Sequence, residues 1–577
     1  MTAAQSLAAV PSVPPLRTWQ RRALSAYLLR RPVDFLAVAT PGAGKTTFAL
    51  RVAAELLADR TVGAVSVVTP TEHLKTQWAA AAAALDIPLD PTFRNADGAT
   101  ARDFRGAVVT YAQVAAAPAL HRARTSARRT LVVLDEVHHA GDALSWGDAV
   151  REAFAPATRR LALTGTPFRS DENAIPFVRY EPEPDGALRS LADHAYGYGE
   201  ALRDGVVRPV IFLAYSGEAR WRTRAGEELS ARLGEPGTAE HVGRAWRTAL
   251  DPAGDWVPAV LRAADQRLSQ VRAGGMPDAG GLVIASDQAA ARAYAGRLRE
   301  IVGEPPVVVL SDDRGASARI ARFAVSTERW MVAVRMVSEG VDVPRLAVGV
   351  YATSAATPLY FAQAIGRFVR ARRAGETASV FLPSVPPLLR LAGELEAVRD
   401  HVLGRRRADG AEGWDDDLLA AARARRDEPG EEERAFTALS ASAHLDQVIF
   451  DGASFGTGAT PGTAEEEEYL GLPGLLEPDQ VALLLRQRQA RQVAEQQRRP
   501  AAAAAAAPAA PGGPVPAHER RAALRRQLNA LVAAHHHRTG RPHGSIHTEL
   551  RRACGGPPTA VASVEQLEQR IATLQSW

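Results

Sequence analysis

The stretch "ATPGAGKTT", Ala39 to Thr47, decides the fold through what surrounds it. The apolar run "FLAVA" leads into it, and an amphipathic helical pattern follows it. A glycine-rich turn between a strand and the N-terminus of a helix surrounds phosphates with backbone N–H groups. The stretch therefore predicts a phosphate-binding loop. Its candidate nucleotide-binding residues are Pro41, Gly42, Ala43, Gly44, Lys45, Thr46 and Thr47.

Lysine is rare in this chain. Among 69 Lys and Arg residues, only Lys45 and Lys75 are lysines. A compact ammonium fits between the β- and γ-phosphates of a nucleotide, whereas a guanidinium is planar and wider. The chain thus keeps Lys45 at a position where arginine would not serve, which indicates that Lys45 takes part in catalysis on a nucleoside triphosphate.

The loop also predicts a metal site. Mg²⁺ prefers oxygen ligands, and the hydroxyl of Thr46 would be one of them. The stretch "TLVVLDEVHH" places Asp135 directly after a strand-like run, where its carboxylate would be a second ligand. Glu136 beside it would orient or deprotonate the attacking water. The expected cofactors are therefore ATP and Mg²⁺.

Composition places the chain among soluble proteins. Its 577 residues are too many for one core, and 46% hydrophobic with 23% charged residues is ordinary for a globular protein. The single Cys554 excludes an intramolecular disulfide and fits a reducing compartment. The sequence shows neither a signal peptide nor a membrane-spanning run. We expect a cytoplasmic protein with no membrane partner.

Two sets of short apolar runs alternate with helical stretches, a pattern typical of parallel α/β sheets. The first set predicts domain 1, residues 1–205, which binds ATP. The second predicts domain 2, residues 206–385, with a helical stretch at 217–272 after its first strand. The runs of domain 1 are "FLAVAT", "AVSVVT", "AVVT", "TLVVLD" and "RLALTG", and those of domain 2 are "VIFLAY", "GLVIAS", "PVVVLS", "WMVAVR", "LAVGVY" and "ASVFLP".

From about Pro386 the strand pattern stops. Residues 386–497 are expected to form a helical accessory region, and 498–516 an Ala/Pro-rich linker. Residues 517–577 regain helical periodicity, with a net charge of +5 from nine arginines and four glutamates. We expect a small basic helical module that binds nucleic acid or a protein partner. Its His-rich stretch "HHHRTGRPHGSIH" lacks the regular spacing of a zinc site.

Seven stretches together resemble the motifs of superfamily 2 helicases, in family order. They are "LRTWQRRAL", "VVTPTEHLKTQW", "VVTYAQV", "LDEVHH", "LTGTPFR", "VSEGVDVPRL" and "QAIGRFVRARR", and the match covers roughly residues 15–385. "LDEVHH" resembles the DExH box, and "TGTPFRSD" with "SEGVDVP" is most similar to type III restriction-enzyme motor subunits and repair helicases of the XPB kind. The phosphate loop begins with Ala39 in place of the consensus Gly, as it often does in this superfamily.

The resemblance implies two tandem RecA-like parallel-sheet domains, followed by a helical C-terminal region and a small helical tail module. It also implies a role for residues outside the phosphate loop. These are Gln20 for adenine, Pro70, Thr71 and Thr110 for the nucleic-acid backbone, His138, Thr164 and Thr166 for coupling, Gly340 and Asp342 for nucleotide, and Gln363, Arg367 and Arg370 for catalysis from domain 2.

Three functions remain open at this point. The first is an ATP-dependent DNA helicase or translocase. The second keeps the enzyme but makes RNA the partner, because such motifs contact the backbone that both polymers share. The third is a non-hydrolysing scaffold recruited through residues 517–577, which the intact Lys45, Asp135 and Glu136 disfavour.

Overall fold

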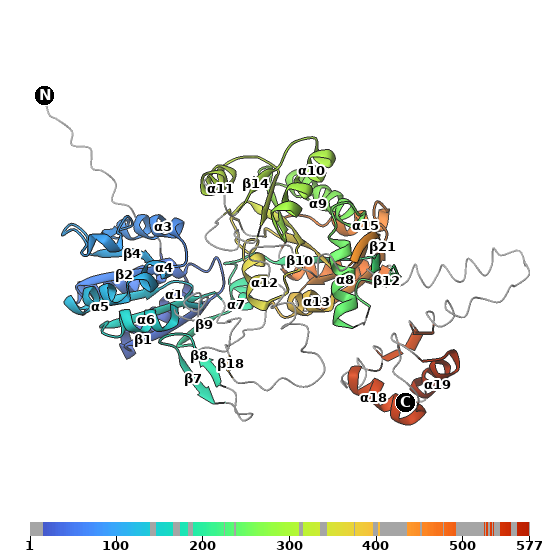
Figure 1. Cartoon of the computed structure of the whole chain (residues 1–577), viewed down its shortest axis with the longest axis horizontal. Helices are drawn as coiled ribbons and strands as arrows, with labels where there is room; N and C mark the ends of the chain where they lie inside the picture. Colours follow the sequence, from blue (N-terminus) through green and yellow to red (C-terminus); the bar gives the residue numbers. More distant parts are fainter. Residues whose placement is uncertain are drawn as a thin grey trace, which may run out of the picture. The chain divides into compact units, whose positions relative to one another are not determined.

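The structure is a computed structural model in which the chain forms two compact units, Met1–Val493 and Ala494–Trp577 (Figure 1). In the first unit it describes residues 15–138, 146–165, 174–182, 188–223, 226–235, 238–310, 315–334, 343–373, 375–395, 402–403, 436–450, 453–476 and 478–491. In the second unit it describes residues 524–525, 527–528, 531–532, 535, 543–555 and 562–575. The predicted linker at 498–516 lies outside the described residues.

Domain 1 is a seven-stranded sheet in which every pair of neighbours is parallel. Its strands are β1 (Asp34–Ala39), β2 (Ala64–Thr69), β3 (Leu89–Asp90), β4 (Gly106–Thr110), β5 (Thr130–Leu134), β6 (Arg159–Thr164) and β9 (His194–Tyr196). They lie in the order β3-β4-β2-β5-β6-β1-β9. All five runs expected from the sequence are strands. They read as continuous apolar runs because helices cover both faces of the sheet.

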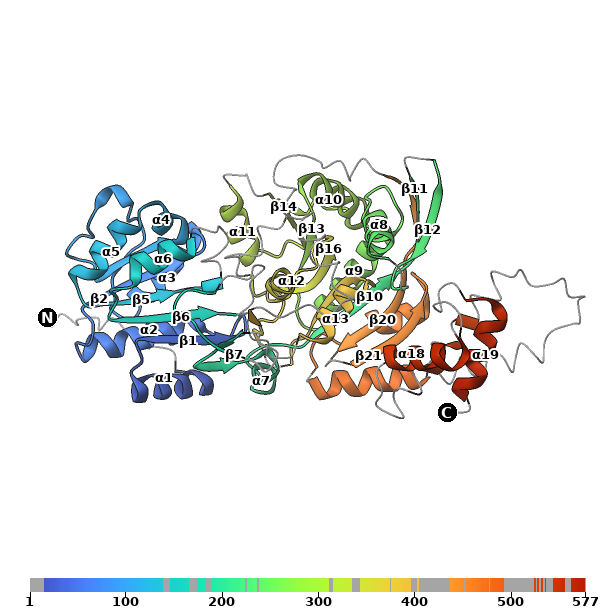
Figure 2. The ribbon, with the colours of Figure 1, turned by 60° about the horizontal axis from the view of Figure 1, so that its bottom comes forward.

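The helices of domain 1 divide between two hydrophobic cores. Residues of α1 (Thr18–Arg30), α2 (Lys45–Ala58) and α3 (Glu72–Ala83) pack in one core. Residues of α4 (Tyr111–Ala116) and α6 (Trp146–Phe154) pack in the other, with α5 (Pro118–Ala127) against them. Figure 2 shows α4, α5 and α6 on one side of the sheet and α1 and α2 on the other. Because neighbouring strands are parallel, their carboxyl ends lie at a single edge of the sheet. The predicted phosphate loop, which follows β1, lies at this edge.

Domain 2 is built on an eight-stranded mixed sheet. Its strands are β10 (Val210–Ser216), β13 (Gly280–Ala285), β14 (Val307–Val309), β15 (Trp330–Val334), β16 (Leu346–Ala352), β17 (Ala378–Pro383), β20 (His444–Phe450) and β21 (Ala453–Ala459). The order is β14-β15-β13-β16-β17-β10-β20-β21. The six expected strands pair in parallel, whereas β20 and β21 add an antiparallel edge. Its further helices are α10 (Gln288–Val302), α11 (Ala316–Val325) and α12 (Pro358–Ile365).

Two sequence expectations for the second half are wrong in part. Helices are present after Pro386, as α13 (Pro386–Gly393), α15 (Ala464–Leu470) and residues 478–491, but the strands do not stop there, since β20 and β21 complete the sheet of domain 2. In the stretch 217–272, the helices α8 (Ala239–Ala249) and α9 (Trp256–Ala273) occupy only the second part. Its first part is a hairpin of β11 (Glu218–Thr223) and β12 (Glu228–Arg232), to which β19 (Phe436–Ala441) adds a third strand.

Further short elements lie beside the two sheets. α7 (Tyr198–Arg203) follows β9. A small antiparallel sheet contains β7 (Arg179–Pro182), β8 (Leu188–Leu191) and β18 (Val402–Leu403). Among the residues that the structure describes, no helix combines the length and the apolar character needed to cross a bilayer.

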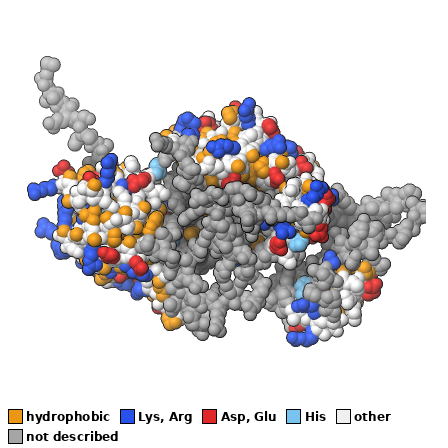
Figure 3. All heavy atoms as spheres, viewed as in Figure 1, with side chains coloured by type: hydrophobic (Ala, Val, Ile, Leu, Met, Phe, Trp, Pro, Cys, Tyr) orange, Lys and Arg blue, Asp and Glu red, His pale blue; other side chains and the backbone are white. Residues whose placement is uncertain are grey.

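The tail unit has a hydrophobic core of its own. Leu528, Ile546, Leu550, Leu567 and Leu574 are buried together, between α18 (His543–Cys554), α19 (Val564–Gln575) and the preceding helical residues. Both acidic and basic side chains appear on the face of this unit seen in Figure 3. No group of three or more His, Cys, Asp or Glu side chains suited to a metal ion occurs among the described residues of the chain.

Candidate active site

The predicted phosphate loop connects β1 to α2. Gly42 and Gly44 have φ angles of 80° and 90°, in the left-handed region where a side chain is strained. α2 begins at Lys45, so the N–H groups of its first turn have no partner within the helix. They form the anion site expected at a helix N-terminus.

Three side chains from the start of α1 hold the carbonyl groups of this loop. An Arg17 guanidinium nitrogen donates to Gly42 O at 2.8 Å, and Trp19 Nε1 donates to Ala43 O at 3.0 Å. Gln20 Nε2 donates to Gly44 O at 2.8 Å. With three successive carbonyls fixed toward α1, the loop is pre-shaped for phosphate. The sequence assigned adenine to Gln20, which stays a prediction. It missed Arg17 and Trp19, although both lie in the quoted stretch "LRTWQ".

The two carboxylates lie directly after β5, beside the loop. Lys45 Nζ forms an ion pair with Glu136 Oε1 at 2.7 Å and also donates to Ala39 O at 3.3 Å. Glu136 Oε2 accepts from Gly165 N at 3.0 Å. Glu136 has a φ of 46°, a left-handed conformation that residues with a Cβ adopt at a cost. The site thus fixes this carboxylate at the expense of local strain.

The two carboxylates differ in acidity. Burial, together with the charge of Glu136, raises the pKa of Asp135 to about 6. Burial also raises the pKa of Glu136, but Lys45 and His138 outweigh it and hold that pKa at about 2. At neutral pH Glu136 is therefore ionised. A cation beside Asp135 would favour its ionised form in the same way.

The residues at the predicted metal site fit Mg²⁺ in their chemistry. The hydroxyl of Thr46, in the first turn of α2, and the carboxylate of Asp135 are the hard oxygen ligands that this ion takes. The carboxylate is buried and oriented, since its Oδ2 accepts from Trp78 Nε1 at 2.8 Å. Thr46 and Asp135 are therefore the residues that would hold Mg²⁺, which when bound neutralises charge on the phosphates.

His138 joins the two domains at this site. Its Nδ1 lies 2.9 Å from Thr164 Oγ1 and 3.7 Å from Glu136 Oε2. Its Nε2 lies 3.2 Å from Nε2 of Gln363, on α12 of domain 2. An amide nitrogen only donates, so His138 Nε2 accepts and the ring proton lies on Nδ1, facing Thr164. The structure brings these three predicted residues together.

The last predicted motif also approaches the phosphate loop. A Cβ built on Gly366 would lie 2.8 Å from Pro41 Cγ, so the backbone of Gly366 packs closely against the Pro41 ring. A Cβ on Gly42 would lie 3.1 Å from Cγ of Arg370, whose side-chain stem therefore contacts the loop. Arg367 is half-buried three residues before Arg370, and both arginines follow the end of α12 at Ile365.

A buried ion pair supports this arginine-bearing segment. Arg208 donates through Nε to Phe368 O at 2.7 Å and through its backbone N to Val369 O at 2.8 Å. Its guanidinium pairs with Glu376 Oε2 at 3.2 Å, and both side chains are fully buried. Breaking such a pair would leave an uncompensated buried charge, so Glu376 holds Arg208 in place. The hydrogen bonds from Arg208 in turn fix the backbone between Arg367 and Arg370. Neither residue was predicted from the sequence.

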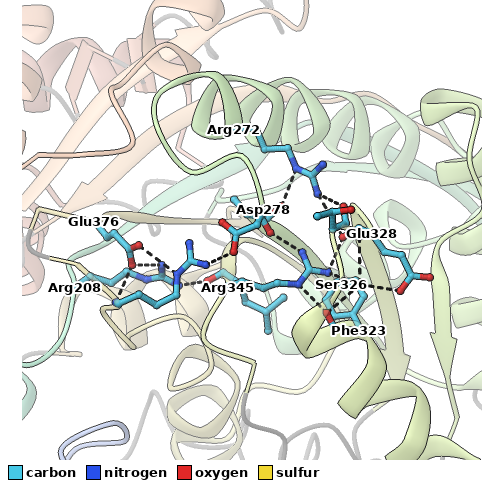
Figure 4. Close-up of polar contacts among 12 residues, drawn as sticks. Arg208, Arg272, Asp278, Phe323, Ser326, Glu328, Arg345 and Glu376 are labelled. Atoms are coloured by element: carbon cyan, nitrogen blue, oxygen red, sulfur yellow. Dashed lines mark hydrogen bonds and ion pairs between the residues drawn. The ribbon is translucent and has the colours of Figure 1, made fainter.

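Figure 4 shows that this pair belongs to a longer polar network across domain 2. Arg372 pairs with both Glu376 and Asp278. Arg345, at the end of "VDVPRL", donates to the carbonyls of Asp278 and Phe323 at 2.8 Å each. The network connects the last two helicase-like motifs within the domain.

The predicted nucleic-acid residues lie beside the carboxylates. Pro70 and Thr71 follow β2, the neighbour of β5, and Thr110 ends β4, which pairs with the other side of β2. The hydroxyl of Thr110 accepts from Gln113 N at 3.1 Å and caps α4. Their contact with nucleic acid stays a prediction. Thr166, Gly340 and Asp342 lie outside the described residues.

The chain is similar to known proteins at two levels. The model of the family "Type III restriction enzyme, res subunit" matches residues 14–169. An uncharacterized protein of Mycobacterium tuberculosis is 62% identical over 563 residues, which cover 97% of this chain and 92% of that protein. An uncharacterized protein of Mycobacterium leprae is 58% identical over 573 residues, which cover 99% and 95%.

Solved structures similar to this one include restriction enzymes and an RNA-bound protein. A fragment of a putative HsdR subunit of a type I restriction enzyme from Vibrio vulnificus matches with a TM-score of 0.44 at 14% identity, over 68% of this chain and 69% of that chain. The type ISP restriction-modification enzyme LlaBIII, bound to DNA, matches with a TM-score of 0.44 at 14% identity, over 94% and 36%. Dbp5 of S. cerevisiae, bound to RNA and ADP BeF3, matches with a TM-score of 0.43 at 14% identity, over 70% and 93%.

Proposed function

Because the chain belongs to one family with these mycobacterial proteins and is a superfamily 2 helicase related to restriction-enzyme motor subunits, we propose that it hydrolyses Mg-ATP to move along DNA. One observation carries this proposal. Lys45, Glu136, His138 and Gln363 form a continuous series of contacts from the phosphate loop of domain 1 to α12 of domain 2. A scaffold that does not hydrolyse ATP has no need of this arrangement.

The contacts suggest how the residues act in turn. In the structure Lys45 is paired with Glu136, so each neutralises the other. When the phosphates of ATP enter the loop, Lys45 turns to them and Glu136 is released to take a proton from the attacking water. Bound Mg²⁺ would supply neutralisation of phosphate charge. Arg367 and Arg370 would stabilise the charge that develops on the γ-phosphoryl from the side of domain 2.

His138 gives the reaction a mechanical consequence. It contacts both the hydrolytic carboxylate and Gln363, so a change at the γ-phosphate alters the hydrogen bonding between the domains. Opening and closing of the two domains through the ATP cycle would move a nucleic-acid strand held near Pro70, Thr71 and Thr110.

We expect DNA to stimulate the ATPase, and we expect DNA binding to weaken steeply with salt because the contacts are to phosphates. The measurement compares ATP turnover with single-stranded DNA, duplex DNA and RNA of equal length, between about 50 and 200 mM salt. DNA is the expected partner because the motifs are most similar to those of restriction-enzyme motors and repair helicases. Stimulation by RNA alone would favour an RNA helicase, and no stimulation by either polymer would favour the scaffold.

For the tail we propose a nucleic-acid anchor tethered to the motor. Removing it by ending the chain near Ala505 should leave the ATP site intact, because residues 517–577 contain none of the motor's predicted residues. A tethered anchor raises the effective concentration of DNA at the motor without adding catalytic groups. The DNA concentration for half-maximal stimulation should therefore rise, while the maximal rate stays within about two-fold.

A charge-removal variant separates this role from protein contacts. Arg551 and Arg552 are exposed in the last turn of α18, and Arg551→Gln with Arg552→Gln removes two positive charges without shortening the chain. If the tail is an electrostatic anchor, this variant should also raise the DNA concentration for half-maximal stimulation, but by less than the truncation does. A truncation effect that this variant does not reproduce would assign the tail to a protein partner, and loss of all ATPase on truncation would contradict the predicted domain boundary.

A further inference from the structure

Asp135, the residue expected to bind Mg²⁺, is held from both faces of the sheet of domain 1. β2 lies between β4 and β5, with Thr69 opposite Thr110 on one side and Val68 opposite Leu134 on the other. The segments that leave β2 and β4, which carry the predicted nucleic-acid residues, therefore begin beside Asp135. One aromatic side chain from each of these two segments donates a hydrogen bond to Asp135.

The first aromatic side chain is Trp78. It lies on α3, two turns after the segment of Pro70 and Thr71, and its exposed fraction is 2%. Its Nε1 donates to Asp135 Oδ2 at 2.8 Å. A hydrogen bond from a neutral donor to a carboxylate fixes the rotation of that carboxylate, as the outer hydrogen bonds of metal ligands do.

The second is Tyr111, which approaches from the opposite face. It is the first residue of α4, directly after Thr110, and it is fully buried in the core formed by α4 and α6. Its hydroxyl donates to the backbone O of Asp135 at 2.9 Å. Trp78 belongs to the other core. Side chain and backbone of Asp135 are thus each held by one of the two segments.

The second lysine of the chain connects these two segments to each other. Lys75, on α3 one turn before Trp78, is buried and donates from Nζ to Gln113 Oε1 at 3.2 Å. The same Gln113 oxygen accepts from Thr110 N at 2.9 Å at the start of α4. A displacement of either helix is therefore transmitted to the other, and both act on Asp135.

Burial alone does not account for the Trp78 hydrogen bond. Within the described part of the chain, three other buried tryptophans, Trp221, Trp246 and Trp256, have indole nitrogens without a hydrogen-bond partner. The fold therefore tolerates an unpaired indole N–H. Trp330 Nε1 also donates to a carboxylate, that of Asp265 in domain 2, but Trp78 donates to the carboxylate that is expected to bind metal.

We propose that Trp78 and Tyr111 are positioning residues that couple nucleic-acid binding to the metal-binding geometry of Asp135. This rests on the proposed function, since it assumes that the segments after β2 and β4 contact nucleic acid. A strand bound there shifts α3 and α4, and their two hydrogen bonds reorient the side chain and backbone of Asp135. Neither aromatic residue needs to touch the nucleotide or the nucleic acid.

The test removes single donor groups and keeps an aromatic ring at each position, although Trp78→Phe also removes part of the ring volume. Trp78→Phe deletes the indole N–H, and Tyr111→Phe deletes only the hydroxyl. The matched controls are Trp246→Phe, a buried tryptophan of domain 2 without an indole partner, and Tyr294→Phe, a buried tyrosine of domain 2 that donates to Leu250 O at 2.6 Å. The controls reproduce the loss of ring volume and of a buried hydroxyl–carbonyl bond away from the site.

Two readouts are followed for each variant of the full chain. The first is binding of a fluorescent ATP analogue as a function of Mg²⁺ concentration, which requires no turnover. The second is the ratio of ATPase rates with and without DNA. For Trp78→Phe we expect the half-saturating Mg²⁺ concentration to rise about tenfold, the usual effect of losing an outer hydrogen bond to a metal ligand. We expect both aromatic variants to lower the stimulation ratio, and the double variant to lower it furthest.

DNA affinity decides between coupling and a purely structural role of the two aromatic residues. Coupling predicts that the DNA dissociation constant of each variant, measured without nucleotide, stays within about two-fold of wild type, since both side chains are buried. The inference is overturned if Mg²⁺ dependence and stimulation match wild type, if the controls lose stimulation equally, or if DNA affinity falls in proportion. Absence of DNA stimulation in the wild-type protein would instead contradict the proposed function, and the Mg²⁺ titration would still test Trp78.

Discussion

Glu136→Gln should retain Mg-ATP binding and lose hydrolysis by roughly 10²- to 10⁴-fold, the contribution of a positioned general base. The amide oxygen can still accept the hydrogen bond that Gly165 N now donates, so the geometry after β5 is preserved. The variant loses the negative charge, and with it the capacity to take a proton from water. Asp135 and Thr46 remain available to hold the metal.

The measurement pairs single-turnover hydrolysis with binding of a fluorescent ATP analogue. Glu55→Gln is the matched control, because Glu55 lies on the surface of α2 in an ion pair with Arg51, outside the site. The control should be indistinguishable from wild type in both assays. If Glu136→Gln lost nucleotide binding together with hydrolysis, the division of labour between the two carboxylates would be wrong.

The first half of the fold was readable from the sequence because its signals are local. Each strand of a parallel sheet is an uninterrupted apolar run, and the phosphate loop is contiguous in the chain. The strands missed in the second half are of another kind. β11 alternates buried and exposed residues within "EARWRT", and β20 pairs with β10 more than 200 residues earlier. Charged residues at exposed strand positions made these segments resemble helical surface.

The site shows the same limit. Motif spacing predicted Lys45, Asp135 and Glu136 as one centre, and in the structure Lys45 pairs with Glu136, the residue that follows Asp135. Motif spacing gave no indication that Arg208 and Glu376, 168 residues apart, form the buried ion pair that supports the segment from Arg367 to Arg370. Such pairs depend on how the sheets pack, and in a chain rich in arginine no single arginine is marked out by sequence.

Trp78 is an intermediate case. It stands at the end of the stretch "VVTPTEHLKTQW", so sequence placed it in the right segment, but the helix start decides which face it occupies. With α3 beginning at Glu72, Trp78 falls on the buried side of the helix together with Lys75, and it reaches Asp135 from there. Both lysines of the chain thus occupy enclosed positions, where a narrow ammonium fits and a guanidinium fork would need more room.

Lys45→Ala and Lys45→Arg should both abolish ATP turnover, and the arginine variant is the more informative. Lys45 Nζ lies 2.7 Å from Glu136 Oε1 and 3.3 Å from Ala39 O. Even a Cβ on Gly165 would lie only 3.0 Å from Nζ and 3.3 Å from Pro41 Cδ. A guanidinium would therefore have to displace Gly165, Pro41 or Glu136, although it carries the same charge.

Arg51→Lys is the control for exchanging arginine and lysine on the same helix, since Arg51 is partly exposed and pairs with Glu55 outside the site. It should turn over ATP at the wild-type rate, whereas both Lys45 variants should fall by at least about 10²-fold, the effect of removing one donor that stabilises transition-state charge. Near-normal turnover by Lys45→Arg would show that charge alone suffices at this position. The persistence of lysine there, in a chain with one other lysine, would then need an explanation other than size.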